Sequence, residues 1–534
     1  MSDGESACGL TRRALIGAAA LPLFACDRKS EVTGALQGAS PDRGHLLREK
    51  RSWPAPSQTR NTHVVIAGGG VAGLAAARAL RQRGVDDFAL LELEDSAGGN
   101  SRAGSVGGIA CPLGAHYLPV PGDDAPEVQA LLEEFDLRRR EAGRWVYDER
   151  HLCHSPQERL FFQGQWQDGL LPVQGVGEAT LAQYRRFAQL VEQARRQSRF
   201  TIPVAASPPG PQRELDAITL AAWLDRQGLS DPHLRWYLDY CCRDDYGAGI
   251  ATVSAWAGIH YFASRHGFQP PGAENGEREA VLTWPEGNGW LTRRLAAPLG
   301  DRLRSGHVVL RIADLRQGVE VDAWNVARQR VERWQAAHCI VALPAFVAAR
   351  VVENAPSSLQ ERARRFRYAP WAVANLQLRE PLRDRPGAPP SWDNVIYGAK
   401  SVGYVDAMHQ SLDPRPGSTV LSWYFAPGEA ARAQVLARGW RDWLGDAAAE
   451  LAPAHPDVAE KLVRVEVARY GHAMAIPVPG TLALRAQGVP HTSRLSFAHS
   501  DWAGYSIFEE AFTAGHRAGA AVRLSASALR SRPA

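Results

Sequence analysis

The chain lacks the features that mark several special classes of protein. It has no stretch of about 18 consecutive apolar residues, so the sequence predicts no membrane-spanning helix. The net charge is only +4 over 534 residues, and the basic residues are dispersed among acids and aromatic residues. A protein that binds a phosphate backbone usually concentrates its positive charge, so we expect no nucleic-acid partner.

Cysteine is also scarce, with 7 in the whole chain. Cys8 and Cys26 belong to the N-terminal segment, and the remaining cysteines show no regular spacing. This pattern argues against a disulfide framework and against a zinc site, and we expect no metal. Buried free thiols are the default interpretation, with a redox pair at Cys241 and Cys242 as the alternative.

The overall composition is that of an ordinary globular enzyme, with 45% hydrophobic and 22% charged residues. The length exceeds what one compact core accommodates, so two or three domains are expected. The 16 tryptophans are many for this length. They fit a bulky core, or an aromatic-lined cleft for an apolar or cationic ligand.

Residues 1–26 have the order of an export signal. Arg12 and Arg13 precede an uncharged stretch that ends at Cys26. The string TRRALIG resembles the twin-arginine class, and LFAC resembles a lipobox. The resemblance implies twin-arginine export machinery as a partner and a lipid on Cys26 that holds the protein at the membrane surface. Asp27 resembles the residue that retains such lipoproteins, which implies the periplasmic face of the inner membrane. A chance arginine pair or a membrane-facing helix is the alternative.

Residues 27–60 follow this signal and are rich in Ser, Pro, Gly, Arg and Glu. They show no periodic pattern of apolar residues, and we expect them to form a tether.

A glycine-rich motif predicts a dinucleotide site. Val64–Ala67 reads as a buried parallel strand, and it is followed by Gly68, Gly70 and Gly73 and then by an Ala- and Leu-rich helix. The first glycine permits the tight turn, the second lets a diphosphate approach the backbone, and the third lets helix and strand pack closely. The diphosphate then meets free N–H groups of the first helical turn, at Val71 and Ala72.

A second predicted strand, FALLELE at 88–94, ends in acidic residues about 20 residues beyond the motif. A carboxylate at this distance binds the ribose hydroxyls of the adenosine, which makes Glu92 or Glu94 the candidate.

The segment LLELEDSAGGNSR resembles the LEAxxRxGGR run of the amine oxidase, protoporphyrinogen oxidase and phytoene desaturase superfamily. This resemblance implies FAD as the cofactor and, aligned on Gly98 and Gly99, Glu92 as the ribose acid. Two arginines of the family correspond to Ser96 and Asn100, and Arg102 lies nearby. We therefore count the following residues as cofactor candidates: Gly98, Gly99, Asn100 and Arg102.

Three later segments are similar to the same superfamily. WPEGNGWLTRRLA at 284–296 resembles its PxGG turn, and the strands at 308–312 and 338–347 resemble its adenine-side and VVxAxP strands. The resemblance implies that Val309 is a backbone partner of the adenine. The closing segment 494–522 resembles FAGTE…GY…EGAxxSGxRAA, which places Asp501 near the ribityl chain. It also implies that Ser506 and Ile507 open the last helix toward the flavin.

The resemblance implies an α/β fold with two parts. One is a Rossmann-like FAD-binding domain with a parallel sheet, built from discontinuous segments: 61–125, 284–355 and 481–534. The other is an α+β substrate domain with a mixed sheet over the flavin, built from 126–283 and 356–480. Within that domain, helices are expected over 174–200 and 430–463, and strands at AVANLQL and TVLSWYF.

The catalytic candidates follow from the resemblance. Amine oxidases of this superfamily often carry a lysine near the flavin, and Val373 or Asn375 takes its place here. Lys400 is a spatial substitute. Tyr505 corresponds to one member of an aromatic pair, and Tyr470 or His472 is the candidate for the other. Two further histidines are candidates: His116, which resembles a family position close to the flavin, and His409.

An unusual cluster, YCCRDDYG at 240–247, places Arg243, Asp244 and Asp245 between aromatic residues. These charges could bind or orient a cationic substrate. The alternative is a salt-bridged surface turn.

These features together favour an FAD-dependent oxidoreductase that removes a hydride from a C–N or C–C bond, with oxygen or a quinone as acceptor. A polyamine-like amine is the first substrate hypothesis. The alternatives are a desaturase or dehydrogenase of an apolar, membrane-derived substrate, a non-redox flavin isomerase, and a non-enzymatic flavoprotein scaffold.

Overall fold

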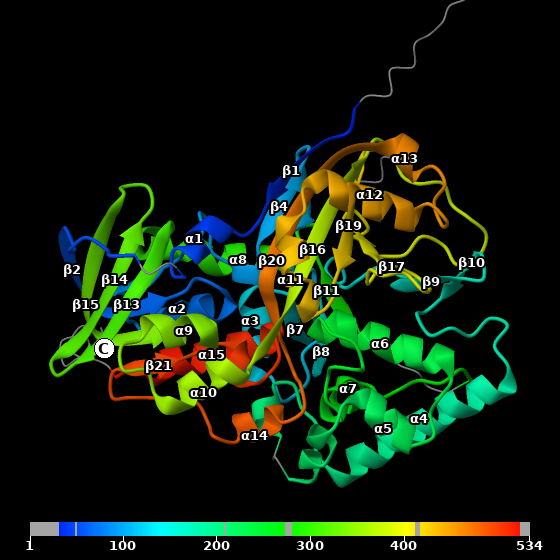
Figure 1. Ribbon diagram of the computed structural model, residues 1–534, viewed down its shortest axis with the longest axis horizontal. Coiled ribbons are helices and arrows are strands. Elements are labelled where there is room, and N and C mark those ends of the chain that lie inside the picture. The colour runs from blue at the N-terminus through cyan, green and yellow to red at the C-terminus, as the bar shows by residue number, and fades with distance from the viewer. Residues whose placement is uncertain (1–30, 49–50, 208–209, 273–279, 412–416, 524–534) are drawn as a thin grey trace, which may run out of the picture.

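The computed structural model describes residues 31–48, 51–207, 210–272, 280–411 and 417–523. The candidate export signal with Cys26 lies outside this range. Two large sheets organise the described chain: one lies to the left of strand β20 in Figure 1, and the other contains β20. This mixed α/β architecture confirms the fold class expected from the sequence. No helix of the described residues has the length and apolar character needed to cross a membrane.

The first sheet has seven strands and forms the left-hand part of Figure 1. Its order is β12 (Leu303–Arg304), β3 (Phe88–Leu91), β2 (Gln58–Ala67), β15 (Arg330–Val341), β14 (Gly318–Asn325) and β13 (His307–Leu315), with β21 (Leu495–Phe497) beside β15. Strands β12, β3, β2, β15 and β21 run parallel, whereas β14 pairs antiparallel with both of its neighbours. The carboxyl ends of the parallel strands therefore meet at one edge of the sheet.

Helix α2 (Val71–Gln82) follows β2, and α15 (Phe508–Ala521) lies against α2. The approach is close, because a Cβ on Gly515 would come within 1.9 Å of the Ala72 carbonyl oxygen. α8 (Gly289–Ala296) also contacts α2, and α9 (Ala345–Val351) and α10 (Ser357–Arg365) follow β15. Val64–Ala67 is fully buried, as expected for a central parallel strand.

The second sheet has eight strands and is mixed. Its order is β1 (Thr33–Gln37), β20 (Leu462–Ile476), β16 (Arg367–Leu378), β19 (Thr419–Phe425), β18 (Tyr404–Asp406), β17 (Asp393–Ile396), β9 (Glu158–Phe162) and β10 (Gln165–Asp168). The β1–β20 and β17–β9 pairs are parallel and the other pairs are antiparallel. AVANLQL lies in β16, and TVLSWYF is β19.

Four helices stand beside this sheet at the lower right of Figure 1. They are α4 (Glu178–Gln197), α5 (Leu220–Arg226), α6 (Pro232–Tyr246) and α7 (Ala255–Ala263). The buried residues of α4 are Thr180, Tyr184, Phe187 and Val191, whose spacing of three and four residues places them on one helix face. The segment 430–463 is broken into α11 (Arg432–Ala437), α12 (Trp440–Leu451) and α13 (Val458–Lys461).

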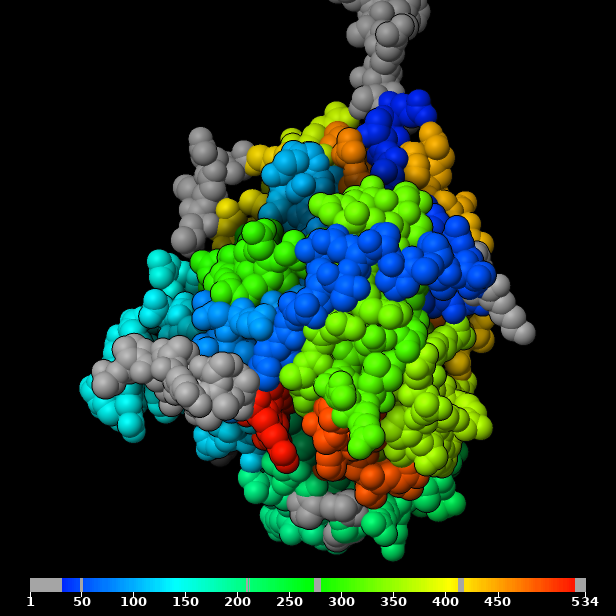
Figure 2. Space-filling view, turned by 90° about the vertical axis from the view of Figure 1, so that its left-hand side faces the viewer, coloured from blue at the N-terminus to red at the C-terminus, as the bar shows by residue number. Residues whose placement is uncertain are grey.

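The described part of residues 27–60 is not a tether. Thr33–Gln37 forms β1 and pairs with β20, and α1 (Pro41–His45) follows it. Trp53 then packs its ring 5.2 Å from that of Trp324. Figure 2 shows this blue stretch lying across the green surface of the first sheet. The composition of this segment predicts a linker. Pairing with the edge of β20 and the packing of a few apolar side chains nevertheless hold it against the two sheets.

Two segments expected in one domain pack in the other. α3 (Pro126–Glu134) was expected in the substrate domain, but Val128 and Leu131 belong to the apolar cluster of the first sheet. α14 (Thr481–Arg485) was expected in the FAD-binding domain, but Leu482 packs in the cluster around α6 and α7. Apolar helix faces alone do not reveal which of two neighbouring cores will bury them.

Candidate active site

The glycine motif lies at the carboxyl edge of the first sheet, where β2 ends. Gly68 has φ +102°, and a Cβ there would come within 2.3 Å of the Ala342 carbonyl oxygen. A Cβ on Gly73 would come within 1.9 Å of the Gly68 carbonyl oxygen. Neither position has room for a side chain, because strand, turn and helix are in backbone contact.

Gly70 differs from Gly68 and Gly73 because the space that a Cβ would occupy is open. It caps the N-terminus of α2, no side chain bonds to the helix start, and a Cβ would meet only the Gly99 Cα atom, at 4.0 Å. The second glycine turn lies alongside, since the Gly98 N–H donates to the Gly69 carbonyl oxygen over 2.8 Å. Open space above an uncapped helix start, formed by Val71 and Ala72, fits the diphosphate of FAD.

Glu92 directly follows β3 and turns toward this loop. Its carboxylate accepts hydrogen bonds from the Gly69 N–H and the Glu94 N–H, both over 2.8 Å. Burial raises the pKa of Glu92, and these two hydrogen bonds oppose that rise. Glu94 accepts instead from the Ser40 N–H over 2.7 Å, so Glu92 is the acid in contact with the glycine turn.

Asn100 and Arg102 extend the second glycine turn. The Asn100 Nδ2 donates to the Ala473 carbonyl oxygen over 2.6 Å, which joins the turn to β20. The Arg102 Nε donates to the Gly99 carbonyl oxygen over 3.2 Å, and its guanidinium lies 3.7 Å from Glu94 Oε2. Arg102 therefore brings a buried positive charge to the turn that lacks the two family arginines.

The other cofactor candidates lie at the same edge. Val309 lies on β13 just beyond the point where the His307 N–H donates to the Glu92 carbonyl oxygen over 2.8 Å. Asp501 accepts from the Ala345 N–H (2.8 Å) and the Tyr368 hydroxyl (2.6 Å), so it caps α9. Burial would raise the pKa of Asp501, but His499 and these donors lower it overall.

Ser506 and Ile507 precede α15 as expected. Ile507 is the residue that precedes the first helical turn, and no side chain bonds to that turn. The Ser506 hydroxyl accepts a hydrogen bond from the Ala475 N–H of β20 over 3.0 Å.

A cavity of about 450 Å³ lies in the second part of the molecule, between the mixed sheet and helices α6 and α7. It is rich in aromatic side chains and also carries acids. Its aromatic wall includes Tyr117, on β6 (Tyr117–Pro119), and the following residues: Tyr237, Tyr240, Tyr261, Trp392, Tyr404 and Tyr424. Its acids include Glu158, Asp244 and Asp393.

His116 connects this cavity to the cofactor edge. Its ring lies 4.4 Å from that of Tyr424 and 5.4 Å from that of Trp392. The Tyr424 hydroxyl donates to the Gly114 carbonyl oxygen over 3.0 Å, and the Ala115 N–H donates to the Asn100 carbonyl oxygen over 2.9 Å. Burial lowers the pKa of His116 to about 3, so its imidazole is neutral at physiological pH.

Helix α6 carries Asp244 into the cavity. Asp231 caps the helix start, Pro232 opens it, and Gly247 ends it at φ +69°. Leu234, Leu238 and Cys241 form its buried face, and Asp244 lies one turn beyond. The cluster at 240–247 is thus a buried helix end rather than a surface turn.

The charges of this helix end are only partly matched. Arg243 pairs with Asp239, and Asp245 pairs with Arg265. Burial, then repulsion from Asp245, raises the pKa of Asp244 to about 7. Burial, then repulsion from Asp244 and Glu158, raises the pKa of Asp393 strongly.

The structure places Lys400, the candidate substitute for the family lysine, outside the cavity wall. Val373 and Asn375 lie on β16 and are fully buried, and the Asn375 amide bonds to Pro112 and Ser422. Lys400 lies in the loop between β17 and β18, and its side chain is exposed. Its backbone N–H donates to Glu450 over 3.0 Å, which orients the loop outward. Lys400 does not line the cavity, and its role as a spatial substitute stays a prediction.

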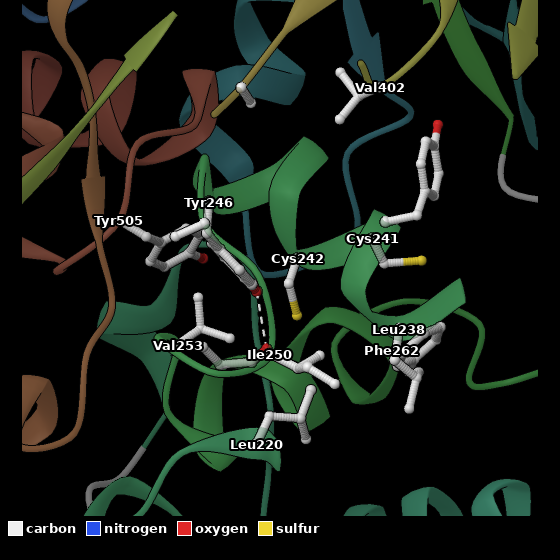
Figure 3. Close-up of a cluster of buried hydrophobic side chains, with 14 of the residues drawn as sticks. Leu220, Leu238, Cys241, Cys242, Tyr246, Ile250, Val253, Phe262, Val402 and Tyr505 are labelled. Atoms are coloured by element: carbon white, nitrogen blue, oxygen red, sulfur yellow. Dashed lines mark hydrogen bonds between the residues drawn. The ribbon is translucent and has the colours of Figure 1, made fainter. Parts of the chain in front are cut away.

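The other candidates do not form part of the cavity wall. His409 bonds to the His154 carbonyl oxygen over 2.8 Å, and His472 packs on Phe346 with ring centroids 4.6 Å apart. Tyr505 is buried beside Tyr246, as Figure 3 shows, and its hydroxyl donates to Glu510 over 3.1 Å. The family resemblance implied that these residues lie near the flavin, but in this structure their side chains lie outside the cavity lining.

The same buried cluster contains the two adjacent cysteines. Cys241 and Cys242 extend from α6 among apolar side chains in Figure 3, and both are free thiols. Burial raises the pKa of both thiols. They therefore lack the thiolate character that a redox pair requires.

Comparison with known proteins indicates a flavin site, as the arrangement of the glycine turns does. The model of the flavin containing amine oxidoreductase family matches residues 71–523. The L-amino acid dehydrogenase of Synechocystis sp. is 23% identical over 482 residues, which cover 86% of this chain and 94% of that protein. A Baeyer-Villiger monooxygenase of Pseudomonas aeruginosa is 29% identical over 152 residues, which cover 25% of this chain and only 28% of that protein.

A solved structure of putrescine oxidase bound to putrescine has the same fold, with a TM-score of 0.66 and 18% identity over 86% of this chain and 99% of that chain. The family match spans most of the sequence and includes helix α2, the second glycine turn at Gly98 and Gly99, and the closing helix. The chain therefore belongs to the flavin containing amine oxidoreductase family and is an FAD-dependent oxidoreductase.

Proposed function

We propose that this enzyme oxidises an amine of the polyamine type by hydride transfer to the flavin. One observation carries the proposal: an aromatic-walled cavity in which Asp244 and Asp393 make no ion pair with any described residue. Half-buried carboxyl groups that make no ion pair favour a cationic ligand, and aromatic faces favour the same charge.

The protein contributes mainly binding and orientation. FAD, when bound at the glycine turns, accepts the hydride and carries the electron chemistry. The aromatic walls exclude water from the reacting carbon, and burial keeps the imidazole of His116 neutral, so it adds no positive charge that would repel an ammonium group. The carboxyl groups hold the charged remainder of the substrate. Oxygen or a quinone reoxidises the cofactor.

The test is a panel of amines mixed with the purified holoenzyme. We expect putrescine or a related amine to bleach the flavin band without oxygen, and to release hydrogen peroxide in air if oxygen is the acceptor. A flavin band that persists with every amine contradicts the proposal.

We also propose that the protein is exported by the twin-arginine machinery and anchored through a lipid on Cys26 at the periplasmic face of the inner membrane. The order of Arg12, Arg13 and Cys26 supports this proposal. Cys26→Ala should move the enzyme from the membrane fraction to the soluble fraction. A membrane-bound variant contradicts the lipid anchor.

A further inference from the structure

Asp244 differs from the charged residues around it because its carboxyl group lacks a polar partner. In the part of the chain that the structure describes, it makes neither a hydrogen bond nor an ion pair, although it lines the cavity. Asp393, in contrast, accepts a hydrogen bond from the Tyr240 hydroxyl over 3.5 Å. Asp244 is therefore the carboxyl group best placed to take a ligand.

Among the described residues, the arginines that act on Asp244 already have carboxylate partners of their own. Arg243 on the same helix pairs with Asp239, and Arg265, which follows α7, pairs with Asp245. Glu158 on β9 and Asp393 on β17 add negative charge, and His116 is neutral. Arg265 and Arg243 attract an ionised Asp244 only from within their own ion pairs, so a cation that enters the cavity would stabilise the carboxylate further.

Amine oxidation and carboxylate binding require different protonation states of nitrogen. Loss of a hydride from the carbon next to nitrogen needs the lone pair of that nitrogen, so the oxidised amine must be neutral. A carboxylate in a buried cavity binds a protonated ammonium group instead. One nitrogen cannot be neutral and protonated at once, so a substrate that is oxidised and also pairs with a carboxylate needs two nitrogen atoms.

We propose that Asp244 binds the second, unoxidised ammonium group of a diamine and releases its own proton to solvent as the diamine binds. The inference rests on the proposed function. Before binding, the group is a neutral carboxylic acid. Afterwards it is a carboxylate paired with R–NH₃⁺, and one proton has left the protein for each Asp244 that was protonated.

The pKa of Asp244, raised to about 7, determines the pH range in which this proton release can be measured. At about pH 6 most Asp244 is protonated, so Asp244 itself releases close to one proton on binding, and at about pH 9 it releases almost none. The reacting nitrogen of the diamine loses a proton of its own, which adds to the total at both pH values.

The first experiment compares putrescine with butylamine, which lacks the second ammonium group. Asp244→Asn should lower kcat/KM for putrescine by at least about 30-fold, as expected for a lost buried charge pair, and leave butylamine within about threefold. Asp244→Glu should restore part of the putrescine activity. The matched control is Asp168→Asn, which removes an exposed carboxylate lining the same cavity and should leave both amines within about threefold.

The second experiment counts protons without turnover. The probe is putrescine with two methyl groups on each carbon next to nitrogen, which has no hydride to lose. Calorimetry in two buffers of different ionisation enthalpy should show that the wild-type holoenzyme releases about one proton more at about pH 6 than at about pH 9. Asp244→Asn should lose the part of this difference that comes from Asp244 and keep only the smaller part that comes from the reacting nitrogen of the diamine. The wild-type comparison stands even if the variant does not fold.

The outcomes separate the two proposals. If putrescine and butylamine are both oxidised and Asp244→Asn affects them equally, this inference fails and amine oxidation stands. The same holds if proton release does not change between the two pH values. If no amine reduces the flavin, the proposed function fails and this inference fails with it.

Discussion

The cofactor edge and the substrate cavity are built in opposite ways. The cofactor edge consists of two short glycine turns and one acid, Glu92, whose roles follow from backbone contacts. The cavity is assembled from side chains that extend from β6, β9, α6, β17 and β19. The first tolerates almost no change of shape, whereas the second tolerates changes of shape but responds to changes of charge.

The largest effect should come from Gly73→Ala. The new methyl group has no space against the Gly68 carbonyl oxygen at 1.9 Å, so strand and helix must separate. We expect a loss of about 3 kcal/mol in the free energy of unfolding and a protein that purifies without flavin.

The control for Gly73→Ala is Gly445→Ala in α12, where nothing lies within 4 Å. This variant should gain up to about 1 kcal/mol from helix propensity. Equal denaturant midpoints for the two variants contradict the steric role of Gly73.

The next effect concerns Gly70, where the space is open. Gly70→Ala should leave the unfolding free energy of the apoprotein within about 0.5 kcal/mol. The dissociation constant for FAD should rise by about tenfold or more, because the methyl group points into the space of the diphosphate. Fluorescence titration of the apoprotein with FAD measures this change.

Gly439→Ala in α12 is the matched control, since Gly439 also precedes a helix with extended backbone angles, φ −81° and ψ 170°. If Gly70→Ala and Gly439→Ala bind FAD equally well, the diphosphate lies elsewhere.

A smaller effect is expected on the pH dependence of stability. The folded state raises the pKa of Asp244 to about 7 from 3.8, so it holds this proton more tightly than the unfolded chain does. The contribution of Asp244 to stability is therefore fully present below about pH 4 and is lost as the pH rises through about 7. Asp244→Asn removes this loss and should raise the Tm at about pH 8 by on the order of 2 °C, with little change at about pH 4. A parallel pH profile for variant and wild type argues against a buried Asp244.

The smallest effect is expected at Lys400. Its side chain is exposed on a loop. Lys400→Ala should therefore leave kcat/KM for any amine substrate within about twofold, as for an ordinary surface substitution. A much larger loss of kcat with normal flavin content would return this lysine to the list of catalytic candidates.

These differences also explain how far the sequence could predict the molecule. The glycine turns, Glu92 and the strands β16 and β19 were predicted because each is encoded in a contiguous stretch with its own steric logic. The edge strand β1 was missed, because pairing with an open sheet edge requires little of the sequence that pairs.

The cavity was predicted only in part. Asp244 was a candidate from the sequence because three consecutive charged residues lie between aromatic residues. Glu158 and Asp393 carried no signal, since a single acid in a strand is normally a surface residue. Their proximity arises only when β9, β17 and α6 come together. The outward position of Lys400 carried no signal for the related reason that sequence distance does not reveal the direction of a loop.

The most direct test of the account is an anaerobic titration of the wild-type holoenzyme with putrescine, followed by the visible flavin band. If the cavity delivers an amine to FAD at the glycine turns, the band is bleached in proportion to the putrescine added, and Asp244→Asn requires far more of the amine for the same bleaching. A protein that carries no flavin, or a band that putrescine and every other amine leave unchanged, contradicts the account.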